Sequence, residues 1–208
     1  MEGQEYLNQL AAEARPIKQK NGLTSSKLFI GLIVAIVALI IIVIAGMVIN
    51  GNQGGEKNLG SALKLHIDNT SSIIKTYQNN IKSSDLRSSS ASLDSILDDT
   101  STKLTNYLVE KYKYKEKSVE KKILSDATTA SEELDAELFE AKINGVLDRI
   151  YAHKMAYEIS LLLAEESKLM ETSRNETLDD LLKTSYDSLE NLYPKFNDFS
   201  ETKTIRKE

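Results

Sequence analysis

The sequence contains no cysteine, two histidines and two prolines. The absence of cysteine excludes disulfide bonds, a thiolate nucleophile, a lipoprotein cysteine and cysteine-ligated zinc or iron–sulfur sites. With only His66 and His153, a histidine-rich metal site is not expected either. After residue 60 the chain has one glycine, Gly145, and one proline, Pro194, and such a composition is typical of long helices.

One long apolar run stands out from an otherwise polar chain. The 208 residues have a mean hydropathy of −0.31, a value that an ordinary soluble domain would have. Residues 28–49, however, are 22 consecutive residues without a charged or polar side chain. As a helix they extend ~33 Å, which matches a hydrocarbon core of ~30 Å. We therefore expect a transmembrane helix at residues 28–49, in contact with the lipid bilayer.

The basic residues that flank this run predict its orientation. The 20 residues before it contain Arg15, Lys18, Lys20 and Lys27, and the 20 residues after it contain Lys57 and Lys64. This bias predicts a single-pass signal-anchor in the cell membrane, with residues 1–27 as a short cytoplasmic segment and the C-terminal domain extracytoplasmic. The alternative is a signal peptide cleaved after Ala45, but the apolar part of a signal peptide spans only ~7–15 residues.

The remainder of the chain is acidic. Residues 1–49 carry a net charge of +1, whereas residues 50–208 carry 22 basic and 28 acidic side chains, a net charge of −6. An acidic domain of this kind argues against general nucleic-acid binding, so no nucleic-acid partner is expected.

After a predicted Gly/Asn linker at residues 50–55, apolar residues recur at helical spacing. The pattern predicts an all-α fold: an extracytoplasmic up-and-down bundle of four to five helices with coiled-coil-like seams at residues 56–196, followed by a polar tail at 197–208. The first helix is expected at 56–82, with the seam Leu63, Ile67, Thr70, Ile74, Tyr77 and Ile81. The second is expected from Asp85, with the seam Leu86, Ser90, Leu93, Leu97, Thr100, Leu104 and Leu108. Its serines and threonine predict a weaker or partly exposed helix, with a loop at 88–90 as the alternative.

A third helical region has two apolar stripes, which predict a central position in the bundle. A capping box at Thr129 and Glu132 marks its start. One stripe is Phe139, Ile143, Val146, Ile150, His153 and Tyr157, and the other is Leu134, Leu138, Ala141, Leu147 and Tyr151. Asn144-Gly145 would suit a helix end, but the unbroken stripe favours one continuous helix.

The last helix is expected to begin with a capping box at Ser173–Glu176 and to end near Pro194. Its seam is Leu178, Leu182, Ser185, Leu189, Leu192 and Phe196.

Residues 111–122 have the most unusual local composition, with six lysines, two glutamates and two interleaved tyrosines. Lysines are attracted to anionic lipid or wall polymer, and tyrosines suit a membrane interface. The predicted contact residues are Lys111, Tyr112, Lys113, Tyr114, Lys115, Lys117, Lys121 and Lys122. The alternative, which is commoner for charge runs, is a solvated helix face with the tyrosines packed inward.

Sequence motifs for catalysis are absent. The chain has no Glu-x-x-His, no His-Glu-x-x-His, no Gly-x-Ser-x-Gly and no glycine loop for phosphate. We therefore predict no catalytic residues, no cofactor and no metal site, and we expect His153 to be a hydrogen-bonded histidine of the core.

Together these features predict a membrane-anchored envelope protein that presents a helical bundle for binding or structural contacts, not catalysis, with a protein partner in the envelope. One alternative is a sensor-like ectodomain that signals through a partner chain, because residues 1–27 are too short for a signalling domain. The other is an all-helical envelope enzyme.

Overall fold

The computed structural model describes residues 52–115, 117 and 119–205, and this part of the chain is all-α, as predicted. Its helices are α3 (Asn52–Tyr77), α4 (Ser84–Tyr112), α5 (Lys121–Ile143), α6 (Leu147–Thr172) and α7 (Glu176–Ile205), with a short 3-10 helix, η1 (Gln78–Asn80), after α3. None of the helices in these ranges is long and apolar enough to cross a membrane. The predicted transmembrane helix at 28–49 and the segment 1–27 lie outside the described residues.

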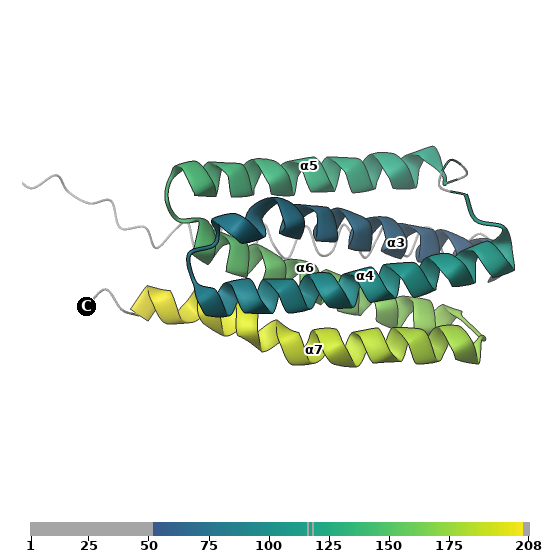
Figure 1. The fold of residues 1–208 in the computed structure, drawn as a ribbon. Coiled ribbons are helices and arrows are strands. Elements are labelled where there is room, and N and C mark those ends of the chain that lie inside the picture. The colour runs from purple at the N-terminus through teal and green to yellow at the C-terminus, as the bar shows by residue number, and fades with distance from the viewer. Residues whose placement is uncertain (1–51, 116, 118, 206–208) are drawn as a thin grey trace, which may run out of the picture. The chain divides into compact units, whose positions relative to one another are not determined.

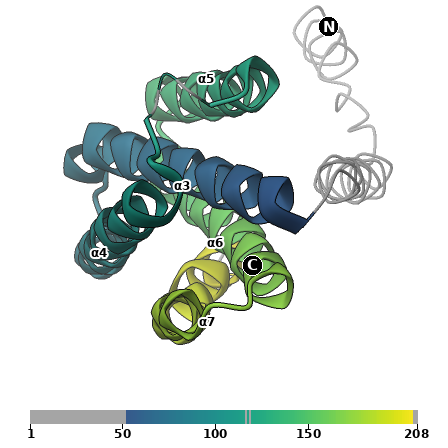
Figure 2. The ribbon, with the colours of Figure 1, turned by 90° about the vertical axis from the view of Figure 1, so that its right-hand side faces the viewer.

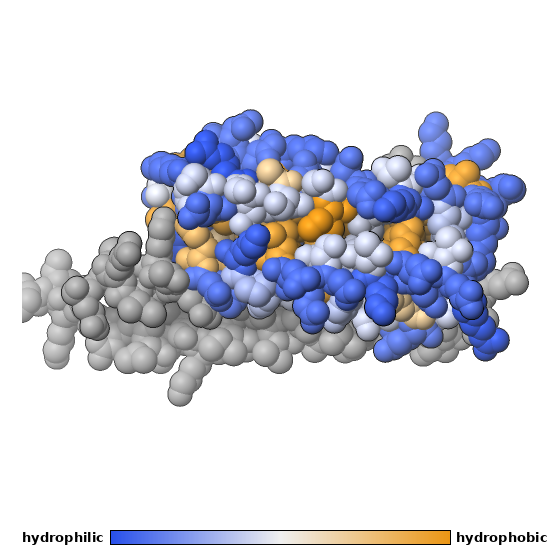
Figure 3. Space-filling view, turned by 60° about the horizontal axis from the view of Figure 1, so that its bottom comes forward, coloured by the Kyte–Doolittle hydropathy of each residue, from blue (hydrophilic) through white to orange (hydrophobic). Residues whose placement is uncertain are grey.

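Successive helices run in opposite directions (Figure 1). Helices α3, α4, α7 and α6 surround one core, because α3 contacts α4 and α6, and α7 contacts both α4 and α6. Helix α5 lies outside these four, against α3 and α6 (Figure 2). The face drawn in Figure 3 is mainly hydrophilic, with a broken band of apolar residues between polar ones. The described residues therefore form a four-helix bundle with a fifth helix on its outside.

Three of the predicted seams form the core. Every seam residue predicted for the first, second and last helices is buried, and none of them exposes more than 4% of its surface. The expectation of a partly exposed second helix is wrong, because Ser90 and Thr100 are as buried as the leucines around them. The alternative of a loop at 88–90 is also wrong, because α4 is helical through these residues. Their hydroxyl groups contact Tyr151 and Ser185 on neighbouring helices, and this pairing allows polar side chains to be buried.

The prediction of one continuous helix through Asn144-Gly145 is wrong. Gly145 has a φ of +70°, a left-handed conformation that glycine adopts without steric cost. The N–H of Val146 donates to the carbonyl of Ala141 at 3.0 Å, and the N–H of Gly145 donates to that of Lys142 at 3.2 Å. These two bonds are a Schellman motif, which satisfies the last carbonyls of α5 and ends it.

This break changes which apolar stripe is buried. Phe139, Ile143 and Val146 expose 55%, 69% and 39% of their surfaces, whereas the second stripe, Leu134 through Tyr151, is buried. The helix α5 buries only four residues, so it is peripheral and not central. The turn at Gly145 separates α5 from α6, which packs on α7 as well as on α3. The stripe from Phe139 to Tyr157 crosses this turn, so its residues do not share one face of one helix.

Three helix ends also differ from expectation. Helix α5 begins at Lys121, so Thr129 lies inside it and caps nothing. Asn175 and not Ser173 caps α7, because its Oδ1 accepts the N–H of Leu178 at 3.1 Å. Helix α7 continues past Pro194 to Ile205, since the fully buried Phe196 keeps the following turn packed on the bundle.

Two predicted boundaries therefore fall inside helices. Helix α3 already begins at Asn52, within the stretch predicted as a linker, and α7 extends into the predicted polar tail.

Candidate surface-contact site and buried polar clusters

The lysine-rich residues 111–122 join two helices. Lys111 and Tyr112 end α4, and Lys121 and Lys122 begin α5. Lys113 has a φ of +53°, which ends α4, and its N–H donates to the carbonyl of Val109 at 3.0 Å. The predicted contact residues are thus placed on two helix ends and the non-helical connection between them.

Lys111 is paired with a buried carboxylate of the bundle. Its Nζ lies 2.8 Å from Oε1 of Glu56, in the second turn of α3, and Tyr107 donates its hydroxyl to the same oxygen. Burial raises the pKa of Glu56, but the hydrogen bonds from Lys111, Tyr107 and Tyr112 outweigh it and hold this pKa below its ordinary value. Lys111 therefore fixes the end of α4 to the start of α3.

Both tyrosines pack inward, as in the alternative that the sequence left open. Tyr114 exposes 7% of its surface, and Tyr112 is half-buried with its ring centroid 5.4 Å from Nζ of Lys111. Their rings hold the connection on the bundle instead of projecting from it.

The other lysines of this segment, Lys113, Lys115, Lys117, Lys121 and Lys122, are exposed. They lie at the same end of the bundle as the start of α3, because Asn58 of α3 donates to Oε1 of Glu120 at 2.9 Å. The structure thus pairs Lys111 with Glu56 of α3 and leaves the side chains of the other five lysines exposed.

Two clusters of polar side chains could not be predicted from the sequence, and His66 is the centre of the first. On α3, its Nε2 lies 2.7 Å from Glu158 and its Nδ1 lies 2.9 Å from Glu165, both on α6. Burial lowers the pKa of His66, but the two carboxylates raise it more, to well above 6.5. The partners are 92 and 99 residues away, so no local spacing could identify them. Across the described ranges, no group of His, Cys, Asp and Glu side chains could hold a metal ion.

The expectation for His153 is wrong. Its side chain is exposed on α6, and Phe139, Ile143 and Val146 of the same stripe are exposed as well. Partial burial and the neighbouring Lys154 lower its pKa, and Glu137 opposes them only in part.

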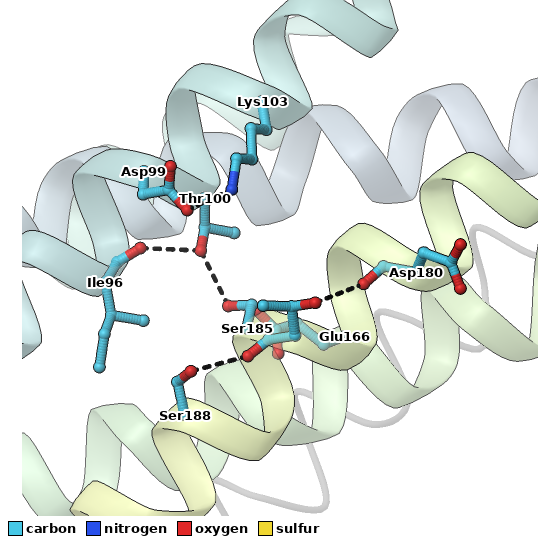
Figure 4. A network of polar contacts seen from close by, with 9 residues as sticks. Ile96, Asp99, Thr100, Lys103, Glu166, Asp180, Ser185 and Ser188 are labelled. Carbon is cyan, nitrogen blue, oxygen red and sulfur yellow. Dashed lines mark hydrogen bonds and ion pairs between the residues drawn. The ribbon is translucent and has the colours of Figure 1, made fainter.

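Glu166 belongs to the second cluster, which joins three helices (Figure 4). It is fully buried on α6, and its Oε1 lies 2.6 Å from Oγ of Ser185 on α7. Ser185 in turn lies 2.9 Å from Oγ1 of Thr100 on α4, which is 2.8 Å from the carbonyl of Ile96. Burial raises the pKa of Glu166 to about 8, although the contact with Ser185 opposes this shift.

The hydroxyl groups of this cluster donate toward Glu166. Thr100 donates to Ser185, and Ser185 donates to Oε1 of Glu166. Oε2 of Glu166 is buried without a hydrogen-bond partner among the described residues, so burial outweighs the contact with Ser185. A pocket of about 60 Å³ adjoins the cluster between α4 and α7 and is lined by Ile96, Asp99, Thr100, Lys103, Leu181, Thr184, Ser185 and Ser188. A hollow of this size suits water and not a substrate, so the cluster is best understood as an interhelical contact.

The chain matches no family model, no curated protein and no solved structure in the comparisons with known proteins.

Proposed function

We propose that this protein is a single-pass membrane protein of the cell envelope. In this proposal residues 28–49 anchor it, the N-terminus is cytoplasmic, and the bundle is an extracytoplasmic module for binding or structural contacts and not an enzyme. One observation carries the proposal: α3, the first helix of the bundle, begins at Asn52, three residues after 22 residues without a polar side chain. A run of this length fits the hydrocarbon core of a bilayer.

The outward face of α5 supports a contact role. Phe139 and Ile143 expose 55% and 69% of their surfaces, and Val146 follows them at the turn into α6. Large apolar side chains gathered in water favour contact with another protein surface. The proposal therefore implies that a protein partner in the envelope binds this face of α5.

Cysteine labelling tests the anchor and its orientation. Because the chain has no cysteine, a single substitution gives one reactive site. In intact cells, a membrane-impermeant maleimide should modify Ser125→Cys in the bundle, and should modify Ser25→Cys in the N-terminal segment only after permeabilisation. The chain should also stay in membranes after a carbonate wash. Reversed labelling, or a mature chain that begins at Gly46, would overturn the proposal.

Photo-crosslinking in native membranes tests the contact role. A crosslinker beside the exposed residues of α5 should give one defined adduct in the wild type, and Phe139→Ser with Ile143→Ser should remove it. Val109 is the matched control, because it is exposed by 45% on α4. An adduct that is lost equally with Val109→Ser would contradict a contact at α5.

A further inference from the structure

The lysine-rich connection is held at one end of the bundle. The N–H of Tyr114 donates to the carbonyl of Leu108 at 3.2 Å, and the side chains of Tyr114 and Ile123 are buried on either side of the connection. Asn58 and Glu56 of α3 bind Glu120 and Lys111, respectively. Lys113, Lys121 and Lys122 are therefore each directly next to an anchored residue, which reduces the entropy lost on contact.

Four lysines form the charged surface of this end. Lys113, Lys117, Lys121 and Lys122 are exposed, and within the described part of the chain none of them has a carboxylate within 4.0 Å. Lys111 is not part of this surface, because Glu56 already neutralises it. Residues 110–126 of the sequence contain six lysines and four acids, Glu110, Glu116, Glu120 and Asp126, so this stretch carries a net charge of +2.

Chain length limits the distance between the apolar run and the start of α3. Asn52 follows Ile49 by three residues, and three residues of extended chain reach about 10 Å. The four lysines lie at the end of the bundle where α3 begins, as the contacts of Asn58 and Glu56 show. Charges within about one Debye length of a membrane, ~8 Å at physiological salt, are attracted to anionic headgroups.

We propose that Lys113, Lys117, Lys121 and Lys122 bind anionic phospholipid headgroups of the membrane that anchors the chain. This inference rests on the proposed anchor at residues 28–49. The contact holds the bundle with its α4–α5 connection at the bilayer surface, so that the opposite end, with the exposed residues of α5 near Gly145, points away from the membrane.

Fluorescence quenching in vesicles tests the contact. The full chain carries a dye at Ser125→Cys, an exposed position in the second turn of α5, or at Ser84→Cys, an exposed position at the opposite end of the bundle. Each labelled protein is reconstituted in two kinds of vesicle, phosphatidylcholine alone and phosphatidylcholine with phosphatidylglycerol. Both kinds of vesicle contain a headgroup-linked quencher. Quenching of the Ser125 dye should increase with phosphatidylglycerol and fall at high salt, and the Ser84 dye should change little.

Lysine substitution identifies the charges. Each of the four lysines changed to glutamine should lower the ratio of lipid-bound to free bundles about fivefold at low salt. The matched control changes Lys82, Lys142, Lys183 and Lys195 to glutamine, which removes the same charge from exposed positions elsewhere. It should leave quenching unchanged. A triple variant that keeps Lys113, which is in the left-handed conformation, is the second variant if the quadruple one loses helical circular dichroism.

Equal quenching with and without phosphatidylglycerol, or an equal loss in the control variant, would overturn the lipid contact. Binding of the four lysines to poly(glycerol phosphate) but not to vesicles would overturn the lipid contact in favour of a wall polymer. Failure of the full chain to float with the vesicles would instead refute the anchor, and so the two proposals fail in different measurements.

Discussion

Ser185 and Glu166 approach within 2.6 Å across the interface of α6 and α7, where Glu166 is wholly excluded from solvent. A carboxyl group in this position is more stable protonated than ionised, which is why burial raises its pKa to about 8. Ionisation would leave a buried charge with one close donor. The interface between α6 and α7 is therefore more stable when Glu166 is protonated.

We expect this proton to make stability fall with pH. The folded-state pKa of about 8 exceeds the ordinary value of 4.5, so the folded state retains a proton that the unfolded state has lost. The contribution of Glu166 to the free energy of unfolding should decrease from about pH 4.5 to about pH 8 and change no further above that. In Glu166→Gln, which is neutral at every pH, this contribution should be absent, so the wild type should lose more stability over this range by an amount on the order of a few kcal/mol.

Urea unfolding of the full chain in detergent micelles, followed by circular dichroism at several pH values, measures this difference. The control is Glu190→Gln, which changes an exposed glutamate on α7. If the wild type and Glu166→Gln respond equally to pH, Glu166 is ionised in the folded protein.

The two histidines should titrate on opposite sides of pH 6.5. Glu165 and Glu158 raise the pKa of His66, whereas burial and Lys154 lower that of His153. The stabilisation from His66 should be complete below pH 6.5 and disappear as the pH passes its folded-state pKa. Imidazole resonances in an NMR titration report both values in one sample. Glu165→Gln should lower the pKa of His66 and leave that of His153 in place, and a change in both would point to a general loss of structure.

Asp148 should be needed for the connection between η1 and α4. Its Oδ1 and Oδ2 accept the backbone N–H groups of Lys82 and Ser83, each at 2.9 Å. Asp148→Ala leaves both donors without this acceptor and should reduce the free energy of unfolding by about 1–3 kcal/mol, and Asp148→Asn, which keeps one acceptor oxygen, by less. Urea unfolding measures both. Asp187→Ala, at an exposed site on α7, should have little effect, and an equal loss there would show that the effect is not specific to this connection.

Substitution of Gly145 should distinguish a helix end from a continuous helix. At a φ of +70° alanine is strained even though no atom lies within 4 Å of its Cβ, so Gly145→Ala should destabilise the protein by about 1 kcal/mol. Gly145→Asn should cost less, because asparagine tolerates this conformation. Thermal unfolding measures both. A more stable alanine variant would indicate that α5 and α6 are continuous.

Spacing predicted most of the core because each seam is a local property. The residues from Leu63 to Ile81 and from Leu178 to Phe196 repeat at intervals that match one face of a helix, and one face of α3 and of α7 is buried. Spacing failed at Phe139 and Ile143, because it cannot distinguish a stripe that faces the core from one that faces solvent when a helix has both. The same limit explains why His153 was assigned to the core.

The buried polar contacts could not be predicted, because their partners are distant in the sequence. Ser185 lies 19 residues from Glu166 and 85 residues from Thr100, and nothing near any of them marks the pairing. The lysine-rich segment is the opposite case. Its composition predicted a surface contact. Only the structure, through the ion pair between Lys111 and Glu56, shows that one of its lysines has a structural role.

The position of α5 outside the other four helices has a consequence for local stability. Only Ile123, Leu134, Leu138 and Ala141 of this helix are buried, so α5 is attached by much less apolar surface than any helix of the core. Segments held this weakly open without global unfolding, and their amide hydrogens exchange earlier than those of the core. We therefore expect α5 to open from α3 and α6 while the other four helices remain folded.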